Sequence, residues 1–118
     1  MTTFLCRLDE IPDGDSNRFI AEVNGIRRGY LAVRQGAKVF VYGNRCPHIG
    51  SPLDFQPGKF LNLEKTHIMC STHGALFRIE DGYCISGPCA GKSLPRCAVE
   101  VRGTEVHIRD ESSVTGGP

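Results

Sequence analysis

Two short segments of the chain each place a cysteine beside a histidine. In the first segment, one residue separates Cys46 from His48. In the second, two residues separate Cys70 from His73. The chain has only four histidines, so half of them lie in these two segments. Because thiolate and imidazole are good ligands for zinc and iron, the pattern predicts a metal centre with these four side chains as ligands.

Two kinds of metal centre accept two cysteines and two histidines. Zinc binds such a set tetrahedrally, but in zinc fingers the two cysteines lie close together in sequence and the two histidines follow as a separate pair. Here each segment supplies one cysteine and one histidine. In a Rieske [2Fe–2S] centre, two cysteines bind one iron and two histidines bind the other. The mixed spacing therefore favours the binuclear centre over zinc.

The two segments resemble the cluster-binding loops of Rieske ferredoxins over most of their length. The shared pattern is C-x-H-x-G in CPHIGSPL (46–53), then C-x-x-H-G followed by an aromatic residue and a later Gly-Pro in CSTHGALFRIEDGYCISGP (70–88). The resemblance covers roughly residues 3–110. It implies an all-β fold, with an antiparallel sandwich-like or barrel-like base that carries a small cluster-binding subdomain of two loops.

The same resemblance implies one [2Fe–2S] cluster per chain. Cys46 and Cys70 would bind one iron, and His48 and His73 would bind the other. Two ferric irons, two sulfides and two thiolates sum to about zero charge, whereas four thiolates leave a cluster about two units more negative. The cluster with two histidines therefore accepts an electron more easily, at potentials of about −150 to +300 mV, whereas plant-type clusters with four cysteines have potentials of about −400 mV. The implied chemistry is one-electron transfer without an enzyme activity of the chain itself.

Two departures from the family pattern narrow the type of carrier. Respiratory Rieske proteins add a disulfide between the loops, at positions that Ser51 and Thr72 occupy here. They also place a serine and a tyrosine hydroxyl against the cluster sulfurs, where this chain has Ala75 and Phe77. Hydrogen bonds to sulfur raise the potential. We therefore expect a low-potential protein that resembles the ferredoxin components of ring-hydroxylating oxygenase systems.

The resemblance also implies partners. A flavin-dependent reductase would donate the electron and a terminal oxygenase or related enzyme would accept it, both through transient docking. We expect a small apolar contact patch around the histidines, formed by Ile49, Pro52, Ala75 and Pro88. Two alternatives stay open. The chain could be the Rieske-like small subunit of a nitrite reductase, or a zinc-stabilised interaction module without redox activity.

The four remaining cysteines match no ligand position of the pattern. Cys6 and Cys97 lie in strand-like runs and are expected to behave as small buried hydrophobic residues. Cys84 and Cys89 lie five residues apart on either side of the Gly-Pro turn. We expect them to be reduced structural thiols, because a reducing cytosol disfavours disulfides; a disulfide or redox sensor is the alternative.

Strand signals surround the two motifs. Residues 18–35 contain two strand-like runs around Asn24-Gly25, a strong hairpin signal. Residues 38–43 alternate in type as a further strand, and residues 97–110 predict a second hairpin with a glycine turn. His107 alternates with apolar neighbours in that hairpin, so we expect it to face solvent.

The chain is expected to form one domain over residues 1–110, followed by a flexible tail, 111–118. Prolines and glycines recur in residues 44–93, which we expect to be loop-like around the two motifs, with at most a short turn at 60–65. No helix is expected. The extra length of residues 51–69, between the two motifs, has no assigned role.

The composition indicates a soluble globular protein. Of 118 residues, 40% are hydrophobic and 23% charged, and the formal net charge is +1. So small a charge gives no sign of nucleic-acid or anionic-membrane binding. No apolar run approaches the roughly 20 residues that cross a bilayer, and residues 1–15 lack the pattern of a secretory signal. We therefore expect a cytoplasmic carrier, too short to include the mononuclear iron domain of an oxygenase.

Overall fold

The computed structural model describes residues 2–23, 25–45, 53, 58–70 and 74–109. Within these residues the fold is all-β, as predicted, apart from one short 3₁₀ turn, η1 (Leu8–Glu10). No helix in this part of the chain has the length and apolar character that spanning a membrane requires. The strands in chain order are β1 (Thr2–Arg7), β2 (Ser16–Val23), β3 (Ile26–Gln35), β4 (Lys38–Gly43), β5 (His67–Met69), β6 (Leu76–Arg78), β7 (Cys84–Ser86), β8 (Arg96–Cys97), β9 (Val99–Arg102) and β10 (Glu105–Arg109).

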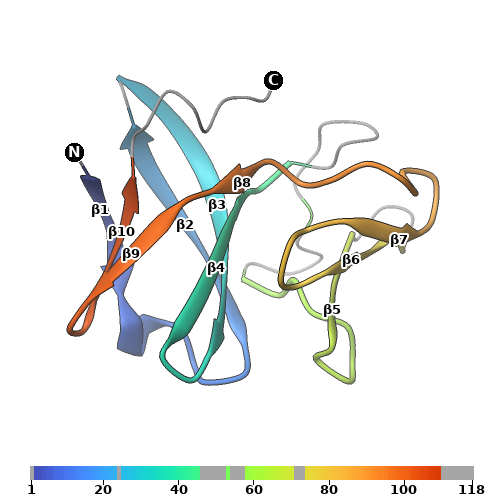
Figure 1. The fold of residues 1–118 in the computed structure, drawn as a ribbon, viewed down its shortest axis with the longest axis horizontal. Coiled ribbons are helices and arrows are strands. Elements are labelled where there is room, and N and C mark those ends of the chain that lie inside the picture. Colours follow the sequence, from blue (N-terminus) through green and yellow to red (C-terminus); the bar gives the residue numbers. More distant parts are fainter. Residues whose placement is uncertain (1, 24, 46–52, 54–57, 71–73, 110–118) are drawn as a thin grey trace.

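The strands form three antiparallel sheets. Their strand orders are β1-β10-β9, β2-β3-β4-β8 and β5-β6-β7. Figure 1 shows the β2-β3-β4-β8 sheet between the other two, with β5-β6-β7 at one end of the molecule. The predicted hairpin at 18–35 is confirmed as β2 and β3, which pair from Ser16 with Val33 to Val23 with Ile26. Gly25 has a positive φ of 78° in the connecting turn, as a tight hairpin requires.

The middle sheet separates two hydrophobic cores. Successive residues of β3 point to opposite faces, so Tyr30 and Ala32 join the core with β1 and β10, while Leu31 and Val33 join the core with β5, β6 and β7. All four are buried. This explains the uninterrupted apolar run in β3, because a strand covered on both faces needs no polar positions. The base and the smaller sheet therefore share one wall.

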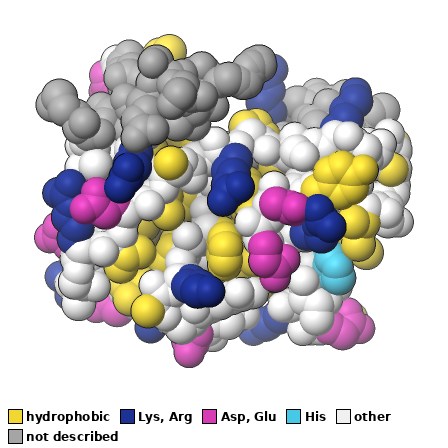
Figure 2. Space-filling view, viewed as in Figure 1, with side chains coloured by type: hydrophobic (Ala, Val, Ile, Leu, Met, Phe, Trp, Pro, Cys, Tyr) yellow, Lys and Arg dark blue, Asp and Glu magenta, His cyan; other side chains and the backbone are white. Residues whose placement is uncertain are grey.

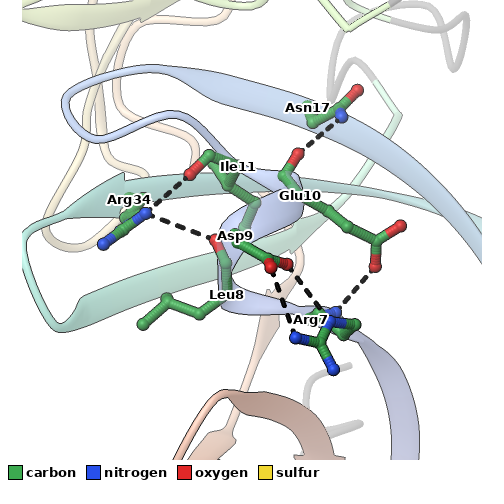
Figure 3. Close-up of polar contacts among 7 residues, drawn as sticks. All are labelled: Arg7, Leu8, Asp9, Glu10, Ile11, Asn17 and Arg34. Atoms are coloured by element: carbon green, nitrogen blue, oxygen red, sulfur yellow. Dashed lines mark hydrogen bonds and ion pairs between the residues drawn. The ribbon is translucent and has the colours of Figure 1, made fainter.

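The connection from β1 to β2 is held by polar contacts of η1 (Figure 3). The backbone N–H of Arg7 donates to Oε1 of Glu10 at 2.7 Å, which closes the start of the turn. Asn17 of β2 donates through Nδ2 to the Glu10 carbonyl at 2.9 Å, and Nη1 of Arg34 donates to the Ile11 carbonyl at 3.1 Å. These contacts attach the β1–β2 connection to both β2 and β3.

Two expectations about the strands need correction. The region 44–93 is not wholly loop-like, because β5, β6 and β7 lie within it. Each has only three residues, too few for an alternating pattern to be recognised. His107 does not face solvent either: its side chain is only 12% exposed. It lies in the central strand of its sheet, opposite Phe4. The Phe4 and His107 rings pack edge to face, with 5.7 Å between the ring centres.

Candidate metal centre

One of the four predicted ligands, Cys70, belongs to the described part of the chain. Cys46, His48 and His73 lie outside it. Within the described residues, no group of three or more histidine, cysteine, aspartate or glutamate side chains is placed to hold a metal ion. The geometry of the site is therefore that of Cys70 and of the residues that anchor the two predicted loops.

Cys70 lies at the end of a short hairpin and is fully buried. It follows β5, and its N–H donates to the Ala75 carbonyl at 2.8 Å, which extends the β5–β6 pairing by one position beyond Met69 and Leu76. The N–H of Gly74 donates back to the Cys70 carbonyl at 2.9 Å. Both backbone groups of Cys70 are thus held, so the second predicted loop starts from a fixed residue.

The ends of the first predicted loop are held by Asn44. This residue follows β4, and its N–H donates to the Gly29 carbonyl of β3 at 3.0 Å. Its side-chain oxygen accepts a hydrogen bond from the N–H of Leu53 at 2.8 Å. The segment between Asn44 and Leu53 contains Cys46 and His48. Asn44 was not recognised from the sequence, although asparagine is a common turn residue whose side chain bonds to nearby backbone.

Both predicted loops end in the same hydrophobic core. Leu53, at the end of the first loop, is fully buried in the cluster that also contains Cys70 and Ala75. Leu31 and Tyr42 of the middle sheet belong to this cluster too. Segments far apart in sequence are therefore anchored on one common wall, as a centre with ligands from both loops requires.

The Gly-Pro turn packs directly against Ala75, which follows the Cys70–His73 motif in sequence. A Cβ atom on Gly87 would lie 2.7 Å from Cα of Ala75 and 2.8 Å from its Cβ, so only glycine fits there without a shift of the backbone. Gly87 also has a φ of +103°. Ala75 is consequently only 1% exposed and cannot belong to a docking patch, which corrects that expectation. Pro88 is exposed as expected, while Ile49 and Pro52 lie outside the described residues.

The turn between β6 and β7 is attached to the middle sheet and to its own side chains. The buried hydroxyl of Tyr42 donates to the Ile79 carbonyl at 2.6 Å, and burial raises the pKa of this phenol. Arg78 pairs with Asp81 and lies 5.1 Å from the centre of the Tyr83 ring. Its hydrogen bond holds the pKa of the Asp81 carboxyl below its usual value. The Tyr42 hydrogen bond thus attaches the β6–β7 turn to the middle sheet.

Charge around this end of the molecule is mixed. Figure 2 shows basic and acidic side chains side by side, with hydrophobic side chains among them over the β6–β7 end. Tyr83 and Ile85 are exposed there. A surface with both basic and acidic side chains, on a chain of net charge +1, favours weak and short-lived contacts over strong electrostatic attraction.

The cysteines outside the ligand pattern are largely as expected. Cys6 is buried and Cys97 half-buried, and burial raises the pKa of the Cys97 thiol to about 11. Cys84 and Cys89 are both buried as thiols, but their sulfur atoms lie only 3.2 Å apart. The sequence indicated their nearness along the chain, not this contact.

The described residues fit an iron–sulfur cluster as its protein support. A cysteine thiolate is the ligand such clusters use, and Cys70, the one predicted ligand among the described residues, is a buried cysteine with both backbone groups held. Gly87 brings bare backbone against the same loop.

Known protein families agree with this description. The sequence model of the Rieske [2Fe-2S] domain matches residues 2–106. A search of curated protein sequences gives no significant match.

Many solved structures share the fold, including the three that follow. The ferredoxin of carbazole 1,9a-dioxygenase from Nocardioides aromaticivorans IC177 superposes with a TM-score of 0.74 at 24% identity, over 94% of this chain and 99% of that one. The Sphingomonas yanoikuyae B1 ferredoxin superposes with a TM-score of 0.71 at 24% identity, over 94% of this chain and 99% of that one. A chain in the complex of reduced oxygenase and oxidized ferredoxin in carbazole 1,9a-dioxygenase superposes with a TM-score of 0.71 at 23% identity, over 93% of this chain and 94% of that one.

Proposed function

Because the chain belongs to the Rieske [2Fe-2S] domain family, we propose that it is a one-electron carrier that serves a terminal oxygenase or a related enzyme. The observation that carries the proposal is the family match over residues 2–106, which includes both Cys/His segments. A [2Fe–2S] cluster is the cofactor of this family, and when bound it supplies reversible one-electron transfer.

The proposed ligands are those of the sequence pattern. Cys46 and Cys70 would hold one iron, and His48 and His73 the other. The burial of Cys70 and its two backbone hydrogen bonds support its part in this set. The Asn44–Leu53 hydrogen bond supports the other loop, because it closes the segment that contains Cys46 and His48.

The work of the remaining residues is to keep the ligands in place when the charge changes. Asn44 closes one loop, the Ala75 carbonyl holds the start of the other, and Gly87 packs behind it. Tyr42 connects this support to the base through the Ile79 carbonyl. A rigid support lowers the structural rearrangement that accompanies electron transfer, which suits a carrier that cycles between two oxidation states.

The proposed partners follow from the likeness to carrier proteins. A flavin-dependent reductase would be the donor, and the acceptor an oxygenase that docks transiently, as in the complex of oxygenase and ferredoxin whose ferredoxin shares this fold. We propose a cytoplasmic location and a single Rieske domain over residues 1–110, with 111–118 as a tail. The chain itself would catalyse no reaction.

The first experiment is an EPR spectrum of the freshly purified protein after reduction with dithionite. Iron, sulfide and zinc are assayed on the same sample. We expect a Rieske-type signal with about two irons and two sulfides per chain. Protein that contains one zinc and no signal, although iron and sulfur were supplied during expression, would support the zinc module and refute the carrier.

Ligand variants test the assignment one side chain at a time. Cys70→Ser, Cys46→Ser and His73→Ala are each expected to abolish the Rieske signal. Cys97→Ala is the matched control, because it removes a half-buried thiol that packs against the other hydrophobic core, the one without Cys70, and it is expected to keep the signal. A full signal in any of the three ligand variants would show that the assignment of that residue is wrong.

A kinetic assay tests the partner. The holoprotein is added to an oxygenase and a flavin reductase of a ring-hydroxylating system, and product formation is followed with and without it. We expect the product to depend on the carrier. Copurification with a large sirohaem protein, together with no support of oxygenase turnover, would instead indicate the nitrite reductase subunit.

A further inference from the structure

Cys84 and Cys89 form a close pair of thiols in the hydrophobic core that also contains Cys70 and Ala75. Their sulfur atoms are 3.2 Å apart, and the two residues are 0% and 1% exposed. The thiol of Cys84 also donates to the Ser86 carbonyl at 3.1 Å. A disulfide has a sulfur–sulfur distance of about 2.05 Å, so the atoms need to approach by only about 1.1 Å.

Backbone hydrogen bonds hold the two cysteines in this arrangement. The N–H of Cys84 donates to the Lys92 carbonyl at 2.8 Å, and the N–H of Gly91 donates to the Cys84 carbonyl at 3.2 Å. The N–H of Lys92 donates to the Cys89 carbonyl at 2.9 Å. The pair is therefore preorganised by the turn, and the bond would form without a change in the fold.

The turn that the pair would close touches the loop of a proposed cluster ligand. Gly87 lies between the two cysteines in sequence and packs against Ala75 with no room for a Cβ atom. The Ala75 carbonyl accepts the hydrogen bond from the N–H of Cys70. A covalent link between Cys84 and Cys89 would thus act on Cys70 through one packing contact and one hydrogen bond.

We propose that Cys84 and Cys89 are a reversible thiol–disulfide site that senses a small-molecule disulfide and adjusts the cluster-binding loop. The thiolate of one cysteine attacks a sulfur of the small disulfide, whose S–S bond breaks and releases one thiol. The second cysteine then attacks the mixed disulfide and releases the other thiol. Two electrons pass from the cysteine pair to the small disulfide, and the two protons leave on the released thiols.

Burial sets the rate of this reaction. Neither cysteine is open to solvent, whereas the turn residues Ser86, Pro88 and Ala90 are exposed. The reagent must therefore wait for the turn to open locally. We expect oxidation to be slow in the native protein and faster under mild denaturant, in contrast to a surface thiol that reacts at once.

The test uses the holoprotein in glutathione buffers of increasing oxidised fraction. After an acid quench, the protein is denatured, alkylated with N-ethylmaleimide and cleaved with trypsin. Cleavage after Arg78 and Lys92 yields a peptide, 79–92, that contains both cysteines and no others. We expect this peptide to change from a doubly alkylated form to an unalkylated form. The mass of the unalkylated form should be lower than that of the dithiol peptide by two hydrogen atoms. Cys84→Ala should prevent the change, and Cys97→Ala, the control, should leave it intact.

A second measurement tests the effect on the loop, and this part rests on the proposed electron-carrier function. The midpoint potential of the cluster is measured by EPR in the dithiol and disulfide states. We expect a shift in the wild-type protein and none in the Cys84→Ala/Cys89→Ala double variant. A potential that is the same in both wild-type states would overturn the coupling to the loop.

The two failures are distinguishable because the peptide assay does not depend on the cluster. A peptide that stays doubly alkylated in fully oxidised glutathione, in mild denaturant as well as in the native protein, overturns the thiol–disulfide site, whatever the EPR spectrum shows. A protein without a Rieske signal that still forms the disulfide overturns the carrier function and leaves the site standing.

Discussion

Replacing Gly87 with alanine should disturb the packing of the Gly-Pro turn against Ala75. The new Cβ would lie 2.7 Å from Cα of Ala75, a backbone atom that cannot rotate away. Overpacking of this kind costs about 1–3 kcal/mol. The residue also has a φ of +103°, which costs a non-glycine residue roughly 1–3 kcal/mol. We therefore expect Gly87→Ala to lose about 2–6 kcal/mol of unfolding free energy.

Gly91→Ala is the matched control for this prediction. Gly91 has a similar φ of +93°, but no heavy atom lies within 4 Å of the place that a Cβ atom would take there. It should therefore lose only the backbone part, roughly 1–3 kcal/mol. The difference between the variants isolates the contact with Ala75, about 1–3 kcal/mol.

The assay is urea unfolding of both variants, prepared in the same way and followed by circular dichroism, with iron content per chain measured in parallel. We expect Gly87→Ala to lose iron as well as stability, and Gly91→Ala to keep its iron. Equal losses of stability in the two variants would refute the reasoning, since it attributes the extra cost to the packing of Gly87 against the loop.

Two further substitutions and one pH dependence test other parts of the molecule by urea unfolding. Ser16→Ala removes a buried hydroxyl that donates to the Gly58 carbonyl at 2.9 Å, and should cost about 1–3 kcal/mol. Tyr42→Phe leaves the Ile79 carbonyl without its 2.6 Å donor and should cost a similar 1–3 kcal/mol or so; a cost near zero in either variant would contradict these assignments. The raised pKa of Cys97, about 11, keeps its thiol neutral in the folded state while the unfolded thiol ionises near pH 9. Stability should therefore fall as the pH rises from about 9 to 11, by less than about 1.4 kcal/mol per pH unit, and more steeply in the wild type than in Cys97→Ala; parallel curves would rule this out.

The strands of the base were predictable because their signals are local. The predicted strand at 38–43 coincides with β4 (Lys38–Gly43), and the Asn24-Gly25 hairpin joins β2 to β3 as expected. Alternation along a strand reports two faces, and the turn residues report where the strand reverses. Both are properties of a few neighbouring residues, so they can be recognised without the rest of the chain.

The errors arose where a distant segment decides the outcome. Alternation showed that His107 and its apolar neighbours lie on opposite faces, but not that Phe4 covers the face of His107. Ala75 was expected in an exposed patch, yet Gly87 packs on it from the next turn. The three-residue strands β5 to β7 escaped notice because they are stabilised by pairing and by the common core, with little preference of their own.

The kind of metal centre could be predicted without the fold, since the types and spacing of Cys46, His48, Cys70 and His73 restrict the metals and clusters that these side chains would accept. The metals that a ligand set accepts depend on the types of its side chains and on how few residues separate them in the sequence. The folded chain was needed to show that both loops end on one buried wall, and that the sulfur atoms of Cys84 and Cys89 lie 3.2 Å apart. Contacts of this kind depend on how the whole core packs, a sum over many weak interactions that no short stretch of sequence contains.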